Sequence, residues 1–184
     1  MLEGRSSAPF MGALHAEGAA LAEVYEFISS LYFRGKLAYA KRFARPPTAL
    51  EGAWVITPTR GLLVTDQRVT LADLREFAAG SIEADDARYR GALRSTAARI
   101  AGALGEGSDA VLLGSIASSR YVEPLAEVFG TRLVVPETFA GRGDMSRGGL
   151  MLRCVDAGQE LVYVTALAAV RHGARPRRLE PRRR

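Results

Sequence analysis

Two short apolar runs separated by one helical segment constrain the fold of this chain more than any other feature. Val111-Leu112-Leu113 and Leu133-Val134-Val135 are unbroken apolar triplets, which are typical of strands covered on both faces. Between them the sequence predicts a helix over residues 119–129, with a serine before it and a glycine after it. A strand–helix–strand unit of this kind favours a parallel pair with a right-handed crossover.

The rest of the chain extends this prediction to a whole domain. With 184 residues, 48% of them hydrophobic and 24% charged, a single globular domain is expected. The predicted fold class is α/β: one domain with a mixed, mostly parallel sheet, flanking helices and a C-terminal edge hairpin. The predicted parts are an irregular N-terminus over residues 1–17, the α/β domain over 18–170, and a basic flexible tail over 171–184.

Spacing and capping residues predict the individual elements. Helices are expected over residues 19–29 and 36–43, from the Thr70 cap through residue 77, and from Asp85 or Asp86 through residue 104. Strands are expected at 54–56 and in the two apolar triplets, and all three are predicted to share one sheet. Residues 150–155 and 161–165 are predicted to form the edge hairpin.

The net charge of +5 is concentrated at the C-terminus. Residues 171–184 hold seven arginines and one glutamate, or +6, so residues 1–170 hold 18 basic and 19 acidic groups, or −1. A tail of this composition cannot bury enough surface to fold alone. It could bind nucleic-acid backbones without sequence specificity. A solvated terminus from an arginine-rich proteome is the simpler interpretation, because only two residues are lysines against 23 arginines.

Several classes of protein are disfavoured by the composition. One cysteine, Cys154, and two histidines leave a poor inventory for a metal site, so no metal or cofactor is expected. No apolar run is long enough for a membrane span, and the N-terminus lacks the basic and apolar regions of a secretory signal. A cytoplasmic protein without a membrane partner is therefore expected. Cys154 is predicted to lie within a strand as a small buried apolar residue.

Three polar segments follow predicted strands, where ligands of α/β sheets usually bind. Residues 57–63 follow the first strand, 114–121 lead into a helix N-terminus, and 139–149 form a loop with four glycines and two arginines. We expect these segments to share one cleft. The third loop matches no phosphate fingerprint, since Gly141-Arg142-Gly143 is not predicted to precede a helix. Its arginines could clamp an anion, or they could pair with Asp144 or face solvent.

The predicted site residues come from these segments. Asp144, Tyr32 and Tyr121 are the candidate catalytic groups. The candidate ligand-binding residues are Thr59, Arg60, Ser118, Arg142, Ser146 and Arg147. For Tyr32 a core or stacking role is the alternative, and for Ser118 a plain helix cap.

Taken in order, these segments resemble the YaaA-like family of bacterial proteins and its uncharacterised relatives. The resemblance covers roughly residues 30–165. It rests on Leu31-Tyr32-Phe33-Arg34-Gly35, on Gly61-Leu62-Leu63 with Asp66, on Ala117-Ser118 with Tyr121, and on Arg142-Gly143-Asp144-Met145-Ser146-Arg147 after Phe139. The family's N-terminal region, with its Ser-Pro-Ala-Lys segment and helix–hairpin–helix-like element, has no counterpart before Tyr32. The resemblance implies a role in peroxide stress and DNA protection.

Three functions remain open at this point. The first is a ligand-binding α/β protein, with or without enzymatic activity, that acts on a small anionic or nucleobase-like or nucleotide-like molecule. The second is a DNA-associated oxidative-stress protein of YaaA type that uses the arginine-rich tail. The third is a non-catalytic interaction domain. Whether the protein is an enzyme is not decided by its sequence.

Overall fold

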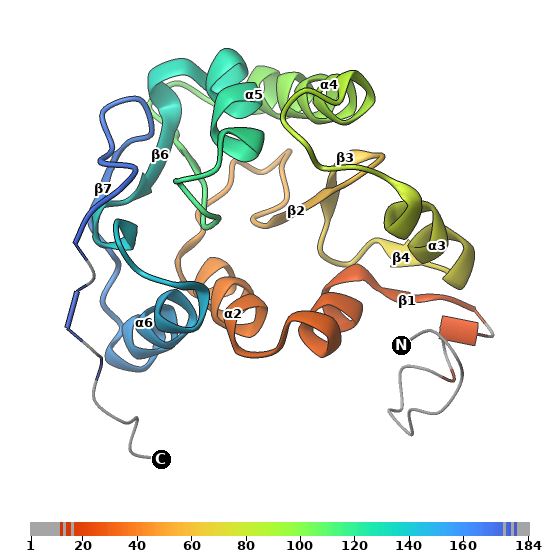
Figure 1. Cartoon of the computed structure of the whole chain (residues 1–184), viewed down its shortest axis with the longest axis horizontal. Coiled ribbons are helices and arrows are strands. Elements are labelled where there is room, and N and C mark those ends of the chain that lie inside the picture. The colour runs from red at the N-terminus through yellow and green to blue at the C-terminus, as the bar shows by residue number, and fades with distance from the viewer. Residues whose placement is uncertain (1–11, 13, 16, 175, 178, 180–184) are drawn as a thin grey trace.

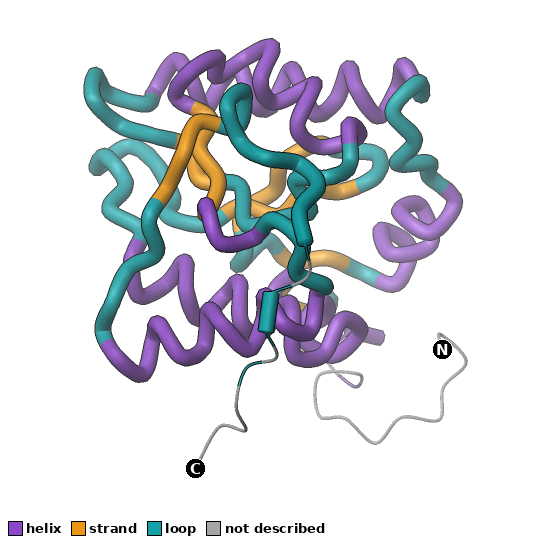
Figure 2. The backbone as a smooth tube through the Cα atoms, turned by 60° about the vertical axis from the view of Figure 1, so that its left-hand side comes forward, coloured by secondary structure: helices purple, strands orange, loops and turns teal. Residues whose placement is uncertain are grey.

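The computed structural model describes residues 12, 14–15, 17–174, 176–177 and 179, and this part of the chain contains both helices and strands (Figure 1). Helices form an upper and a lower layer, and most of the strands lie between them (Figure 2). The chain is thus a mixed α/β protein, as predicted. Within the part that the structure describes, no helix is both long and apolar enough to cross a lipid bilayer.

The first long helix, α2 (Leu21–Phe43), runs without a break for 23 residues. The prediction of two separate helical segments, over 19–29 and 36–43, is therefore wrong. Gly35 lies inside this helix and is buried, because a second helix packs directly against its backbone. The helix ends where predicted, at Phe43, shortly before Pro46 and Pro47, neither of which can continue a helix.

A β-hairpin follows, made of β2 (Trp54–Thr57) and β3 (Gly61–Val64). The predicted first strand is confirmed, but residues 57–63 are not a loop, since the chain turns at once and pairs back. Gly61 has a φ of 66°, and a Cβ on it would lie 2.3 Å from the carbonyl oxygen of Ala92. Only glycine therefore fits this start of β3 against the next long helix.

The N-terminal half also contains a two-stranded sheet and two capped helices. Strand β1 (Ala19–Ala20) pairs antiparallel with β4 (Arg68–Val69). Helices α3 (Leu71–Ala79) and α4 (Ala87–Ala103) begin after Thr70 and Asp86, whose side chains accept hydrogen bonds from backbone N–H groups of the first turn. Both caps are confirmed as predicted.

A three-stranded sheet has the order β5 (Ala110–Val111), β6 (Leu133–Pro136), β7 (Tyr163–Thr165). The predicted parallel pair is confirmed: β5 and β6 are parallel, and α5 (Ser119–Phe129) connects them. The prediction that the first apolar triplet is a strand covered on both faces is wrong, because β5 includes only Val111 of it and Val111 is 40% exposed. Strand β7 is antiparallel to β6. Only one of the strand pairs in the described residues is parallel, so the mostly parallel sheet is wrong. The single sheet is wrong too, because β2 pairs with β3 alone.

The predicted C-terminal edge hairpin is replaced by a helix, α6 (Asp144–Ala157). Residues 150–155 belong to it, and Cys154 is therefore helical and only partly buried. Gly158, with a φ of 63°, ends the helix in the left-handed conformation. Two short 3₁₀ turns, Gly130–Arg132 and Glu137–Phe139, flank β6. Buried Arg147, Gly148 and Met151 recur at helical spacing, a pattern that the apolar run at 150–155 obscured.

The helix pair α4 and α5 is joined through an unusual proline. Pro124 lies inside α5 and has no N–H to donate to the carbonyl of Arg120. The hydroxyl of Tyr89, a residue of α4 that is 1% exposed, donates to that carbonyl oxygen at 3.0 Å. The backbone acceptor freed by the proline is thus satisfied from the neighbouring helix.

Two clusters of buried apolar residues stabilise the structure. The larger extends from Tyr39 to Ala166 and holds the three-stranded sheet between the long helices. The smaller lies around Leu21, Val69 and Phe77, where the start of α2 meets α3.

The beginning of the basic C-terminal segment lies against the rest of the protein, since a Cβ on Gly141 would be 2.2 Å from the carbonyl oxygen of Ala174. Most of the arginines expected to be flexible there (175, 178 and 182–184) lie outside the described residues.

Candidate functional site

The candidate site is built by a crossing of α2 and α6, which lie side by side in Figure 1. At the crossing, Gly35 of α2 faces Gly148 of α6. A Cβ on Gly35 would lie 2.7 Å from the carbonyl oxygen of Gly148, and one on Gly148 would lie 2.8 Å from the Cα of Tyr32. The two backbones therefore touch, and only glycine permits this approach.

This crossing brings charged side chains from both helices together. Arg147, next to Gly148, is only 6% exposed. Its guanidinium donates to a carboxylate oxygen of Asp144 at 3.3 Å and to the carbonyl oxygen of Phe139 at 3.4 Å. Both hydrogen bonds are long, and the Nε–H of Arg147 is buried with no partner among the described residues. Asp144 has a side chain 64% exposed to solvent, so the ion pair that balances the buried charge of Arg147 is itself open to water.

Lys36, on the opposite helix, adds a second cation. Its Nζ lies 4.0 Å from the centre of the Tyr32 ring, over the face of that ring. Among the described residues, no hydrogen bond or ion pair engages this ammonium group. Burial, and secondarily the positive charge of Arg147, lower the pKa of Lys36 to about 8, while the negative charge of Asp144 opposes the shift.

Tyr32 links this cluster to the three-stranded sheet. Its hydroxyl donates to the carbonyl oxygen of Leu113 at 3.1 Å, just beyond the end of β5. Burial raises the pKa of Tyr32 to about 12, with smaller effects from Arg147, Asp144 and Tyr121. At neutral pH the hydroxyl is therefore a proton donor already engaged with the backbone.

Three other predicted site residues, Tyr121, Asp144 and Arg147, contribute to the electrostatic environment of Tyr32. Tyr32, Asp144 and Arg147, together with Lys36, form what we call the α2–α6 cluster. Sequence reasoning missed Lys36. A signal was available, because Lys36 lies four residues after Tyr32 on a helical stretch and is one of two lysines in the chain.

Arg142 and Ser146 lie in the turn before α6 and in its first part. The guanidinium of Arg142 donates to the hydroxyl of Ser146 at 3.2 Å and to the carbonyl oxygen of Thr138 at 3.0 Å. Arg147 thus pairs with Asp144, as one alternative expected, whereas Arg142 pairs with Ser146 and Thr138 instead. The segment is not one long loop, however, since Gly143 is the N-cap of α6 and Gly141-Arg142-Gly143 directly precedes a helix.

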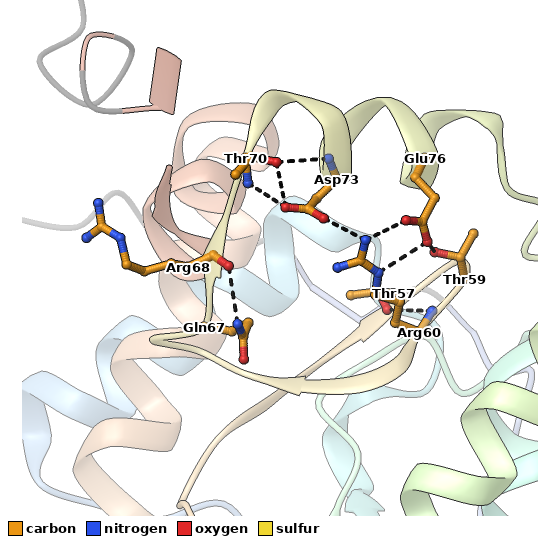
Figure 3. A network of polar contacts seen from close by, with 8 residues as sticks. All are labelled: Thr57, Thr59, Arg60, Gln67, Arg68, Thr70, Asp73 and Glu76. Atoms are coloured by element: carbon orange, nitrogen blue, oxygen red, sulfur yellow. Dashed lines mark hydrogen bonds and ion pairs between the residues drawn. The ribbon is translucent and has the colours of Figure 1, made fainter. Parts of the chain in front are cut away.

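Thr59 and Arg60 belong to a different polar network, on the hairpin and α3 (Figure 3). Arg60 donates to Asp73 at 2.6 Å and forms an ion pair with Glu76. The hydroxyl of Thr59 donates to Glu76 at 2.6 Å. These contacts hold the β2–β3 turn against α3. The premise that this turn and the other two polar segments follow strands of one sheet is wrong, because β2 lies in another sheet.

Ser118 is the N-cap of α5, as predicted, although its side chain makes no capping hydrogen bond. Its carbonyl oxygen instead accepts the N–H groups of Tyr121 and Val122. Tyr121 lies in this first turn of α5, and its hydroxyl group contributes to raising the pKa of Tyr32. The binding role of Ser118 stays a prediction.

No family model, curated protein or solved structure matches this chain. The resemblance to the YaaA-like family therefore stays a prediction, and the chemistry of the α2–α6 cluster carries the functional argument.

Proposed function

We propose that this protein binds a small anionic molecule, such as a nucleotide or another phosphate or carboxylate compound, at the α2–α6 cluster. The observation that carries the proposal is the guanidinium of Arg147, which is buried with an unpartnered Nε–H. A buried N–H group that donates no hydrogen bond costs roughly 1–3 kcal/mol of stability, even where the rest of its guanidinium is paired. An oxyanion accepting from that donor would remove this cost on binding.

Lys36 supports the same conclusion from the facing helix. The buried guanidinium of Arg147 and the half-buried ammonium of Lys36 stand against one carboxylate, Asp144, which is largely in solvent. The local charge is therefore positive, and a ligand of negative charge is the one that this surrounding favours. Within the proposal, Arg147 and Lys36 hold the anion, Tyr121 and Ser118 border the ligand, and Asp144 is the acid–base group if a reaction follows binding.

Titration calorimetry with inorganic phosphate and with AMP tests this proposal. Arg147→Met and Lys36→Met should each weaken binding by about tenfold or more, since a hydrogen bond to a charged group contributes roughly 1.5–3 kcal/mol. Lys41→Met is the matched control, because Lys41 lies exposed on the same helix. Arg60→Met tests the alternative that Thr59 and Arg60 share the site.

The expected outcome is that both control variants bind as the wild type does. A loss of binding in Arg60→Met alone would place the ligand at the hairpin and contradict the proposal. The proposal would also be contradicted if neither inorganic phosphate nor AMP binds to the folded wild-type protein.

In this proposal residues 18–170 act as one cytoplasmic domain. The DNA-associated and interaction-domain alternatives stay predictions, and residues 175, 178 and 180–184 of the tail lie outside the described part.

A further inference from the structure

Asp144 is the member of the α2–α6 cluster that anion binding alone does not explain. Its carboxylate accepts a hydrogen bond from the guanidinium of Arg147 at 3.3 Å, and its side chain is 64% exposed. A hydrogen bond between an arginine and a carboxylate is normally about 2.7–2.9 Å long. A carboxylate held this loosely keeps most of its capacity to accept hydrogen bonds, and it would repel a plain anion bound at Arg147.

We infer that the molecule bound at this cluster is a zwitterion, in which an ammonium group lies close to the anionic group. Its phosphate or carboxylate accepts hydrogen bonds from Arg147 and Lys36, and its ammonium group donates to Asp144. The inference rests on the proposed function, because the anionic end of this molecule is the anion proposed above. It adds the substrate class, which is an aminoalkyl phosphate or an acidic amino acid.

The positions of the charged groups fit such a molecule. In Arg147, which is 6% exposed, the unpartnered Nε and the nitrogen that donates to Asp144 are bonded to the same carbon atom. A ligand oxygen that accepts from the Nε–H at about 2.9 Å therefore lies within a few ångströms of the Asp144 carboxylate. In an α-amino acid or a 2-aminoethyl phosphate, the ammonium nitrogen and an acid oxygen are also only a few ångströms apart. One small molecule can thus engage both residues.

The charges of the cluster match the same class of molecule. Arg147 and Lys36 are cations and Asp144 is an anion, so the cluster has an excess of one positive charge. A 2-aminoethyl phosphate or a glutamate carries the opposite set at neutral pH, two negative charges and one positive charge. Among the described residues, no hydrogen bond or ion pair engages the ammonium group of Lys36. Its N–H groups are therefore available to the second negative charge of the ligand.

A carboxylate in the first turn of a helix also stabilises that helix through its dipole. Asp144 has this position in α6, and Glu23 has the same position in α2. Glu23 is exposed and lies more than three turns before Lys36 on its helix. Glu23→Gln is therefore the matched control for Asp144→Asn, because both variants lose a first-turn carboxylate and only Asp144 lies beside Arg147.

Titration calorimetry at pH 7 with two pairs of compounds tests the inference. The first pair is 2-aminoethyl phosphate and ethyl phosphate, the second is glutamate and glutarate, and the members of each pair differ only in the ammonium group. In at least one pair, the wild-type protein should bind the ammonium compound about three- to fivefold more tightly, as expected of a partly exposed ion pair. The pair that shows this preference identifies the anionic end as a phosphate or a carboxylate.

Asp144→Asn should remove this preference through two opposite changes. Binding of the ammonium compound should weaken because its partner is lost, and binding of the compound without the ammonium group should strengthen because a repulsion is lost. Glu23→Gln should keep the wild-type preference. A preference that persists in folded Asp144→Asn would overturn the assignment of Asp144, with the folded state checked by thermal unfolding.

The comparison within each pair also decides the inference without any variant. Equal affinities within both pairs for the wild-type protein would overturn the zwitterion. Binding of inorganic phosphate or AMP, with no binding of the four paired compounds, would likewise overturn the zwitterion and leave the proposed function standing. If none of these six compounds binds, the proposed function is overturned as well.

Discussion

At the scale of single residues, the α2–α6 cluster is a place where the chain gives up stability. Arg147 is buried and Lys36 is half-buried, and the carboxylate that faces them, Asp144, is largely exposed. A buried cation lowers the free energy of unfolding unless an anionic partner pairs with it well. The arrangement is therefore better explained by a ligand than by the needs of folding.

Lys36→Met should make the protein more stable at pH 7, by roughly 1–3 kcal/mol. The pKa of Lys36 is about 8 in the folded state, against about 10.4 when unfolded. Between these values the unfolded chain binds more protons, so wild-type stability rises with pH. The advantage of the variant should therefore shrink as the pH increases from 8 towards 10.4. Urea denaturation at pH 7 and 10 measures this, with Lys41→Met as control, and a destabilised variant at pH 7 would contradict it.

Asp73 is the opposite case, a charge that supports the fold. Hydrogen bonds from the backbone N–H and then the hydroxyl of Thr70, followed by Arg60, lower the pKa of Asp73 to about 2. Its contribution is fully present above pH 4 and is lost as the pH falls towards 2. Asp73→Ala should cost about 1 kcal/mol at pH 6 and clearly less, though still a measurable amount, at pH 2.5. Exposed Asp85→Ala is the control, and equal losses at both pH values would disprove the linkage.

At the scale of elements, the glycine crossing of α2 and α6 decides where the cluster forms. Glycine lowers the intrinsic stability of a helix by roughly 0.5–1 kcal/mol relative to alanine. At Gly35 and Gly148 the missing side chain allows the backbones of the two helices to touch, which offsets this loss of helix stability. Tyr32 and Lys36 then face Arg147 across the contact.

Gly148→Ala should therefore destabilise the protein by roughly 1–3 kcal/mol, because its Cβ would press on the Cα of Tyr32. Gly91→Ala is the matched control: Gly91 also lies inside a helix, α4, but nothing surrounds its Cβ position within 4 Å. That substitution should stabilise by up to about 1 kcal/mol. Thermal unfolding of both variants gives the comparison. A neutral Gly148→Ala would show that the crossing is loose.

At the scale of the whole molecule, a tyrosine pair connects the first long helix to the last strand. The hydroxyls of Tyr39 in α2 and Tyr163 in β7 lie 2.6 Å apart. The N–H of Leu161 donates to the oxygen of Tyr39 at 2.8 Å, and the hydroxyl of Tyr163 donates to Glu160. Residues more than 120 positions apart are thereby held in one hydrogen-bonded network.

Tyr39→Phe should cost about 1–3 kcal/mol, because the N–H of Leu161 loses its acceptor in a partly buried place. Tyr163→Phe keeps that acceptor and should cost less. Chemical denaturation of the two variants measures the difference. If Tyr163→Phe lowers the free energy of unfolding more than Tyr39→Phe does, the hydrogen bonds of Tyr163 contribute more than the bond from Leu161 to Tyr39, and the prediction is wrong.

Local chemistry was sufficient to predict much of the secondary structure. Thr70, Asp86 and Gly130 mark helix ends correctly, because a cap depends on residues within one turn of it. The β5–α5–β6 unit could likewise be predicted, since a helix that connects two neighbouring apolar strands usually makes those strands parallel. Of the residues at this site, the sequence indicated Tyr32, Tyr121, Asp144 and Arg147, and it predicted one shared cleft for the segments that hold the last three.

Tertiary contacts decided the rest. The apolar run at 150–155 fits a strand or a helix, and burial of Arg147 and Met151 against α2 selects the helix. Arg60 reads as a ligand-binding arginine until α3 supplies its carboxylates. Lys36 lies near Arg147 and Asp144 only because Gly35 contacts Gly148, and these two glycines are far apart in the chain. Electrostatic environment depends on distance in space and on exclusion of water, and neither is encoded by neighbours along the sequence.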